Sequence, residues 1–225
     1  MTIMTMTLKD NVRHPLNLLL VFILPSVLLI IPSTSGGFPF GLTLFGMANM
    51  YCAFLLTRPI ATDRMQNIII RIASSPLRYF RYLFEHLASY MVLLFVQVIL
   101  FVLGIKIIYK DAVWSHVLLI TLYCSYSAMI LSFSLAWNSL FRSYNTSLGL
   151  FSGIGSLMCL VTGVSIPLVF LPDQLIAFTR VLPTYWLPYA LSAINAQDGS
   201  KILLGHSILL LYALIFFLLG SKRRY

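Results

Sequence analysis

The chain has 225 residues, of which 60% are hydrophobic and 9% are charged. Soluble domains carry about 25% charged residues, so this composition excludes an ordinary soluble protein and predicts an integral membrane protein. Its polar sequence is too short for a catalytic domain of its own. The formal net charge of +9 is better explained by membrane topology than by a nucleic-acid partner.

Six apolar stretches predict six transmembrane helices in a single permease-like domain covering residues 1–225. A hydrocarbon core about 30 Å thick needs about 20 helical residues. Only helices and closed barrels satisfy the backbone in lipid, and these stretches lack the polar–apolar alternation of barrel strands. We therefore expect an all-α membrane protein. The predicted spans are 16–31, 38–56, 87–109, 113–138, 147–171 and 202–220.

The basic residues predict the orientation. Eleven of the fifteen Lys and Arg residues fall on the side of the N-terminus and four on the other side. Cytoplasmic loops of membrane proteins carry the excess of Lys and Arg. We therefore expect both termini in the cytoplasm and a multi-pass protein of the plasma membrane. Cys52, Cys124 and Cys159 lie inside predicted spans, and no metal-ligand spacing is present.

A polar segment, residues 57–86, is expected on the cytoplasmic side. Apolar positions at helical spacing predict a short amphipathic helix, with Thr62 as its cap and Asp63 beside its positive end. Ser75-Pro76 ends this helix, because the residue before proline avoids the helical region. Two interpretations remain: a helix that lies on anionic lipid, or a docking helix for a cytoplasmic partner.

The segment 163–200 is expected on the outer side. Prolines divide it into pieces too short to cross the membrane, and its Tyr and Trp residues favour the membrane interface. It predicts a pair of short re-entrant helices that dip into the outer leaflet without crossing. A plain interfacial loop is the alternative.

Polar residues inside the spans are candidates for a translocation path or for helix packing. Gly149, Ser152, Gly153 and Ser156 form a small-residue face, which favours packing. For Asn49 the two interpretations are balanced, and Gln97 and Asn138 are expected to form interhelical hydrogen bonds. The candidate path residues are Thr43 and Asn49 in the second span and Ser152, Ser156 and Thr162 in the fifth.

Four segments together resemble the permease subunit of an ABC type-2 transporter. Their order on six predicted helices carries the resemblance more than any one of them. They are Arg13-His14-Pro15-Leu16-Asn17 followed by Leu24-Pro25, Ser75-Pro76-Leu77-Arg78 with Arg81-Tyr82, Gly163-Val164-Ser165-Ile166-Pro167, and Leu171-Pro172-Asp173-Gln174-Leu175 followed by Val181-Leu182-Pro183-Thr184-Tyr185-Trp186.

The resemblance implies a non-catalytic membrane subunit of an ATP-driven exporter. Two permeases, identical or related, would form the pore, with the second and fifth spans facing the dimer axis. Two copies of a separate ATPase would bind ATP and Mg, and the chain itself has no GxxxxGK[ST] phosphate loop and no expected cofactor. The residues implied to contact the ATPase are Asp63, Arg64, Gln66, Ile69 and Arg71.

Two rival classes are weighed against this. A secondary transporter or channel usually places ionisable groups at the midplane, and none is predicted here. An intramembrane serine protease could use Ser152 and His206, but the GxSG pattern is missing. The apolar spans suit an amphipathic or lipophilic cargo, such as a drug, an antimicrobial peptide or a lipid-like molecule.

Overall fold

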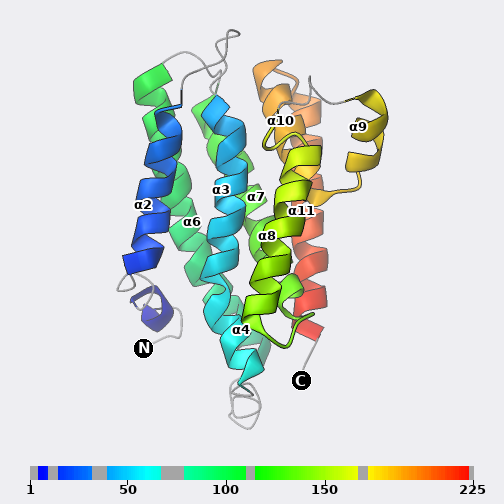
Figure 1. Cartoon of the computed structure of the whole chain (residues 1–225). Coiled ribbons are helices and arrows are strands. Elements are labelled where there is room, and N and C mark those ends of the chain that lie inside the picture. The colour runs from blue at the N-terminus through cyan, green and yellow to red at the C-terminus, as the bar shows by residue number, and fades with distance from the viewer. Residues whose placement is uncertain are drawn as a thin grey trace.

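A computed structural model of the chain describes residues 5–9, 15–31, 40–66, 79–109, 115–166 and 172–222. Every regular element within these ranges is helical, and Figure 1 shows the long helices side by side in one bundle. The predicted all-α fold is confirmed. The elements are a short helix at 5–9, α2 (Pro15–Leu29), α3 (Phe40–Leu56), α4 (Arg58–Met65), α6 (Tyr79–Tyr109), α7 (His116–Asn138), α8 (Tyr144–Val161), α9 (Asp173–Thr179), η2 (Pro183–Tyr185), α10 (Trp186–Asn195) and α11 (Gly199–Lys222).

Four described helices are long and apolar enough to cross a membrane: α6, α7, α8 and α11. By length and composition they correspond to four of the six predicted spans. The first two predicted spans correspond to α2 and α3, of which the structure describes 15 and 17 residues. At 1.5 Å per residue these would reach about 22 and 26 Å, somewhat less than the hydrocarbon core. Six crossings therefore stay a prediction.

The predicted bounds of the fifth span were wrong. The helix runs from Tyr144 to Val161, so it ends ten residues before the predicted end at residue 171. Gly163 adopts a left-handed φ of 87°, and the Val164 N–H donates to the Cys159 carbonyl at 3.0 Å. This is the hydrogen bond of a Schellman motif, which closes a helix with glycine after its cap. Hydropathy missed the end because the sequence after it stays apolar.

The helix α7 lies at the centre of the fold and packs against α3, α6, α10 and α11. Aromatic side chains fill the space between these helices. The rings of Phe45 and Phe101 stack with centroids 3.9 Å apart, and the Tyr123 hydroxyl donates to the Leu42 carbonyl. These contacts bury α7 on several sides.

The bundle has two different ends (Figure 1). The short helix at 5–9, α4 and the last turn of α11 lie at one end, which we call the α4 end. The elements α9, η2 and α10 lie at the other. There α10 fits closely against α3, since a Cβ on Gly46 would overlap the Leu187 side chain. The described part of the segment after α8 forms three short helices, α9, η2 and α10. That these enter the outer leaflet stays a prediction.

Candidate coupling and translocation sites

The helix α4 carries the first part of the expected coupling segment. It begins at Arg58 and has Pro59 in its first turn, where the missing proline N–H costs no hydrogen bond. The Thr62 hydroxyl donates to the Arg58 carbonyl at 3.0 Å, so Thr62 lies inside the helix. The predicted start at Thr62 was wrong, and Pro59 was the better signal. Ser75-Pro76 lies outside the described residues.

Arg64 is the most buried charged residue of α4, with 8% of its surface exposed. Its Nη1 donates to the Leu135 carbonyl at 3.3 Å and its Nη2 to the Gly220 carbonyl at 2.8 Å. These carbonyls belong to the C-terminal turns of α7 and α11, at the negative ends of the two helix dipoles. The Leu135 carbonyl also accepts from the Ser139 N–H at 3.3 Å. The guanidinium is therefore turned into the protein, and it fastens α4 to two spans.

Asp63 and Gln66 lie at different surfaces of α4. The carboxylate of Asp63 accepts a hydrogen bond from the Tyr82 hydroxyl of α6, and the Tyr82 ring lies 4.4 Å from the His86 ring. Gln66 ends the helix and is exposed. Ile69 and Arg71 lie outside the described residues. Of the expected ATPase contacts that are described, Gln66 is the one that faces outward.

Asn49 is fully buried between α3 and α7. Its Nδ2 donates to the Ser127 Oγ of α7 at 2.8 Å, and its Oδ1 has no hydrogen-bond partner among the described residues. Thr43 is also buried, and the Thr162 hydroxyl donates to the Thr184 hydroxyl of η2 at 3.1 Å. These three expected path residues therefore lie inside the protomer.

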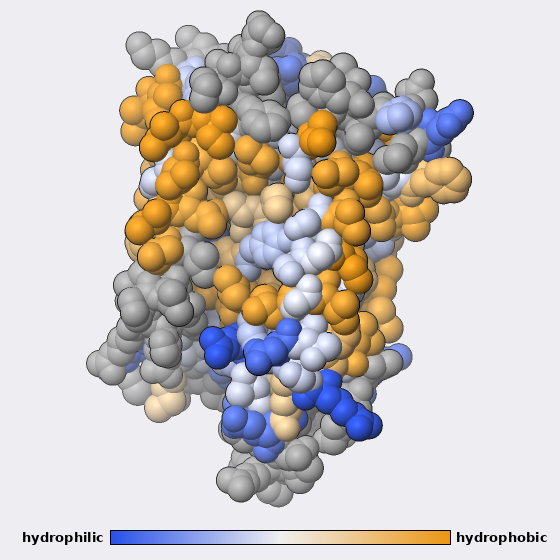
Figure 2. Space-filling view, in the orientation of Figure 1, coloured by the Kyte–Doolittle hydropathy of each residue, from blue (hydrophilic) through white to orange (hydrophobic). Residues whose placement is uncertain are grey.

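Ser152 and Ser156 lie on α8 outside its buried stripe of Ser147, Phe151, Gly155 and Cys159. The Tyr51 hydroxyl donates to the Ser152 carbonyl at 2.9 Å and lies 2.6 Å from the Ser156 Oγ. A Cβ added to Gly149 or Gly153 would meet nothing within 4 Å. We call this surface of α8, with Tyr51 beside it, the α8 face. Figure 2 shows it as a pale strip between hydrophobic flanks.

The five expected path residues thus do not form one site. Two lie on the α8 face, and three are buried, of which Asn49 bonds α3 to α7 and Thr162 bonds the end of α8 to η2. His206 does not approach Ser152: its Nε2 lies 3.2 Å from the Thr121 Oγ1 and its Nδ1 2.9 Å from the Ile202 carbonyl. The serine–histidine pair of a protease is therefore not formed. Among the described residues no group of His, Cys, Asp or Glu could hold a metal ion.

The structure confirms Asn138 as an interhelical hydrogen-bonding residue. Its Nδ2 donates to the Thr57 Oγ1 at 3.2 Å, and its Oδ1 accepts from the Ser147 Oγ at 2.7 Å. This one side chain joins α7 to the residue before α4 and to α8. Sequence reasoning missed Ser127 and Tyr51 as partners, because spacing along one helix does not show which residue of another helix faces it.

Several apolar helices of membrane-spanning length, with the polar helix α4 held against α7 and α11 at one end, define a polytopic membrane protein. The family model described as "ABC-2 family transporter protein" matches residues 32–222. The match covers most of the sequence, so the chain belongs to the ABC-2 transporter family. It is the permease, the membrane subunit that associates with an ABC ATPase. A search of curated proteins finds no match.

Proposed function

We propose that this permease forms an ATP-driven exporter of amphipathic or lipophilic cargo. Two permease copies, identical or related, would enclose the path, and two ATPase subunits would bind at the α4 end. The excess of basic residues at that end supports its position in the cytoplasm. Both termini would then lie on the cytoplasmic side of the plasma membrane. ATP and Mg would be held by the ATPase and not by this chain.

The observation that carries the proposal is the exposure of the α8 face. The helix α8 buries one stripe, formed by Ser147, Phe151, Gly155 and Cys159, and leaves Gly149 and Gly153 facing open space. Small residues let two backbones approach closely in a membrane. A second permease against this face would enclose the hydroxyl groups of Ser152, Ser156 and Tyr51 between the copies. Few polar groups among apolar side chains suit a cargo that is itself amphipathic.

Coupling to ATP hydrolysis would use the contacts of α4. An ATPase that moves Gln66, and with it Ile69 and Arg71 of the following segment, would also move α4. The hydrogen bonds of Arg64 to the Leu135 and Gly220 carbonyls would pass that movement to α7 and α11. In this proposal Asp63 and Arg64 act as positioning residues, and the direct contacts come from Gln66 and the residues after it.

The test is purification of the tagged permease, followed by transport of fluorescent lipophilic compounds in proteoliposomes. We expect an ABC ATPase to co-purify and transport to require ATP hydrolysis. Transport that follows a proton gradient without ATP would instead indicate a secondary transporter. A Gly153→Cys variant, with the three native cysteines replaced, should form a disulfide between permease copies, while Leu103→Cys on the exposed surface of α6 should not.

A further inference from the structure

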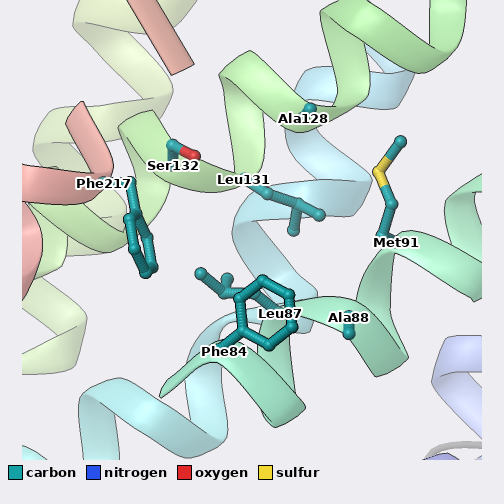
Figure 3. Close-up of a pocket in the computed structure, with 8 residues that line it drawn as sticks. All are labelled: Phe84, Leu87, Ala88, Met91, Ala128, Leu131, Ser132 and Phe217. Atoms are coloured by element: carbon teal, nitrogen blue, oxygen red, sulfur yellow. The ribbon is translucent and has the colours of Figure 1, made fainter. Parts of the chain in front are cut away.

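A crevice of about 350 Å³ opens on the surface formed by α6, α7 and α11. Figure 3 shows its side chains converging from these three helices. The small side chains of Ala88 and Ala128 leave the space open, and Leu131 and Ser132 of α7 form its buried floor. The residues that line it are Phe84, Leu87, Ala88, Met91, Ala128, Leu131, Ser132 and Phe217. Apart from Ser132, all of them are apolar.

The crevice lies at the depth of one leaflet. The helix α6 has 31 residues, or about 46 Å at 1.5 Å per residue, which is longer than the hydrocarbon core. Its lining residues Phe84 to Met91 belong to the half nearer the α4 end. The space is therefore open to lipid chains of the leaflet on that side, and it lies away from the α8 face.

Charge is placed where a lipid headgroup would lie. Arg81 precedes Phe84 by three residues and Ala88 by seven, so the three share one face of α6. The Arg81 side chain is 66% exposed, and its Nε donates to the Glu85 Oε1 at 2.8 Å. The Phe80 and Phe217 rings meet with centroids 5.2 Å apart, so α11 packs beside the first turn of α6.

We propose that this crevice binds one chain of an anionic phospholipid, whose headgroup phosphate pairs with Arg81. An acyl chain would cover the apolar walls, and the Arg81 guanidinium, which is exposed beside its bond to Glu85, would meet the phosphate. Basic residues near a membrane surface attract anionic lipids. A bound lipid would wedge between α6 and α11, the two spans that Phe80 and Phe217 join at the α4 end. This site requires neither the cargo nor the ATPase.

The headgroup is tested by native mass spectrometry of the purified permease, titrated with phosphatidylglycerol or phosphatidylcholine of identical chains. We expect tighter binding of phosphatidylglycerol. Arg81→Gln should weaken it about fivefold, since a surface cation contributes about 1 kcal/mol toward anionic lipid. Lys106→Gln is the matched control, because it removes one exposed charge at the other end of the same helix, and it should leave the affinity unchanged.

The chain site is tested by filling the crevice. Ala88→Trp should weaken binding of both lipids about tenfold, as expected if two methylene groups lose their contacts. Val96→Trp, at an exposed position of α6 outside the crevice, should have no effect. Equal binding of the two lipids, or equal effects of Arg81→Gln and Lys106→Gln, would overturn the proposal even if Ala88→Trp does not fold. Both readouts are independent of transport, so their failure leaves the proposed exporter untouched.

Discussion

The helices α7 and α8 are consecutive spans of similar apolar character, yet they use their surfaces differently. Thirteen of the 23 residues of α7 are buried, around its whole circumference. Only four of the 18 residues of α8 are buried, at every fourth position along one stripe. The helix α7 is the central helix of the bundle, and α8 packs against the rest of the protein through one stripe of residues. The difference teaches that α8 leaves most of its surface available for another molecule, whereas neighbouring helices cover most of α7.

The largest effect is expected from removing the hydrogen bonds that Arg64 makes at the C-terminal end of α7. Arg64→Met removes the donors to the Leu135 and Gly220 carbonyls. Because a hydrogen bond to a charged group contributes about 1.5–3 kcal/mol, we expect a loss of roughly 3 kcal/mol in stability and a clearly lower melting temperature in detergent.

The control for that variant lies on the same helix. Arg58→Met removes an exposed cation that lies 5.3 Å from the centre of the Tyr144 ring, a contact worth about 0.5–1 kcal/mol. If Arg58→Met and Arg64→Met lower the melting temperature equally, the hydrogen bonds of Arg64 to α7 and α11 do not stabilise the fold.

Two glycine substitutions should differ in sign. At Gly220, a Cβ would lie 3.0 Å from the Ala136 nitrogen of α7, so Gly220→Ala should destabilise the protomer by about 1–3 kcal/mol through overpacking. At Gly153 the Cβ meets open space, so Gly153→Ala should stabilise the isolated protomer by about 0.5–1 kcal/mol. Thermal melting of the purified protein measures both. A destabilised Gly153→Ala protomer would show that α8 is covered within the single chain.

Asn49 tests whether the α3–α7 contact is packing or path. Asn49→Leu removes its hydrogen bond to Ser127, and such bonds between transmembrane helices average about 0.6 kcal/mol, so the protomer should fold. If Asn49 only packs, the range of exported compounds should be unchanged, while Ser156→Leu on the α8 face should alter it. A changed cargo range in Asn49→Leu would place the path between α3 and α7.

The smallest effect is expected at the start of α11, at the end of the bundle away from α4. Hydrogen bonds from the Ser200 hydroxyl and from Lys201 lower the pKa of the Asp198 carboxyl from 3.8 to about 2. The stabilisation is therefore present above pH 3.8 and is lost as the pH falls through about 2. Asp198→Asn should remove this acid dependence, seen as hydrogen exchange in the first turn of α11. Because Asp198 is exposed, the melting temperature at neutral pH should barely change.

Hydropathy could predict the class of fold, because the cost of unpaired backbone groups in lipid leaves long apolar stretches little choice but to become helices. Helix ends were less predictable. The end of α8 at Val161 depends on the left-handed Gly163, and the start of α4 depends on Pro59, both local features inside sequence that hydropathy treats as uniform. The candidate residues were chosen for polarity, which identified Asn138 correctly as an interhelical partner but could not show whether Asn49 or Ser152 faces outward.

The sequence by itself determined that this protein is a helical membrane permease, through apolar length, the excess of basic residues at one end and the ABC-2 family pattern. Only the tertiary structure decided that α7 is surrounded, that Arg64 turns inward to two helix ends, and that α8 keeps an open face. The physical reason is that burial is a property of pairs of helices. A span that is apolar all round is equally suited to protein and to lipid. Its sequence therefore does not show which face packs against protein and which faces lipid.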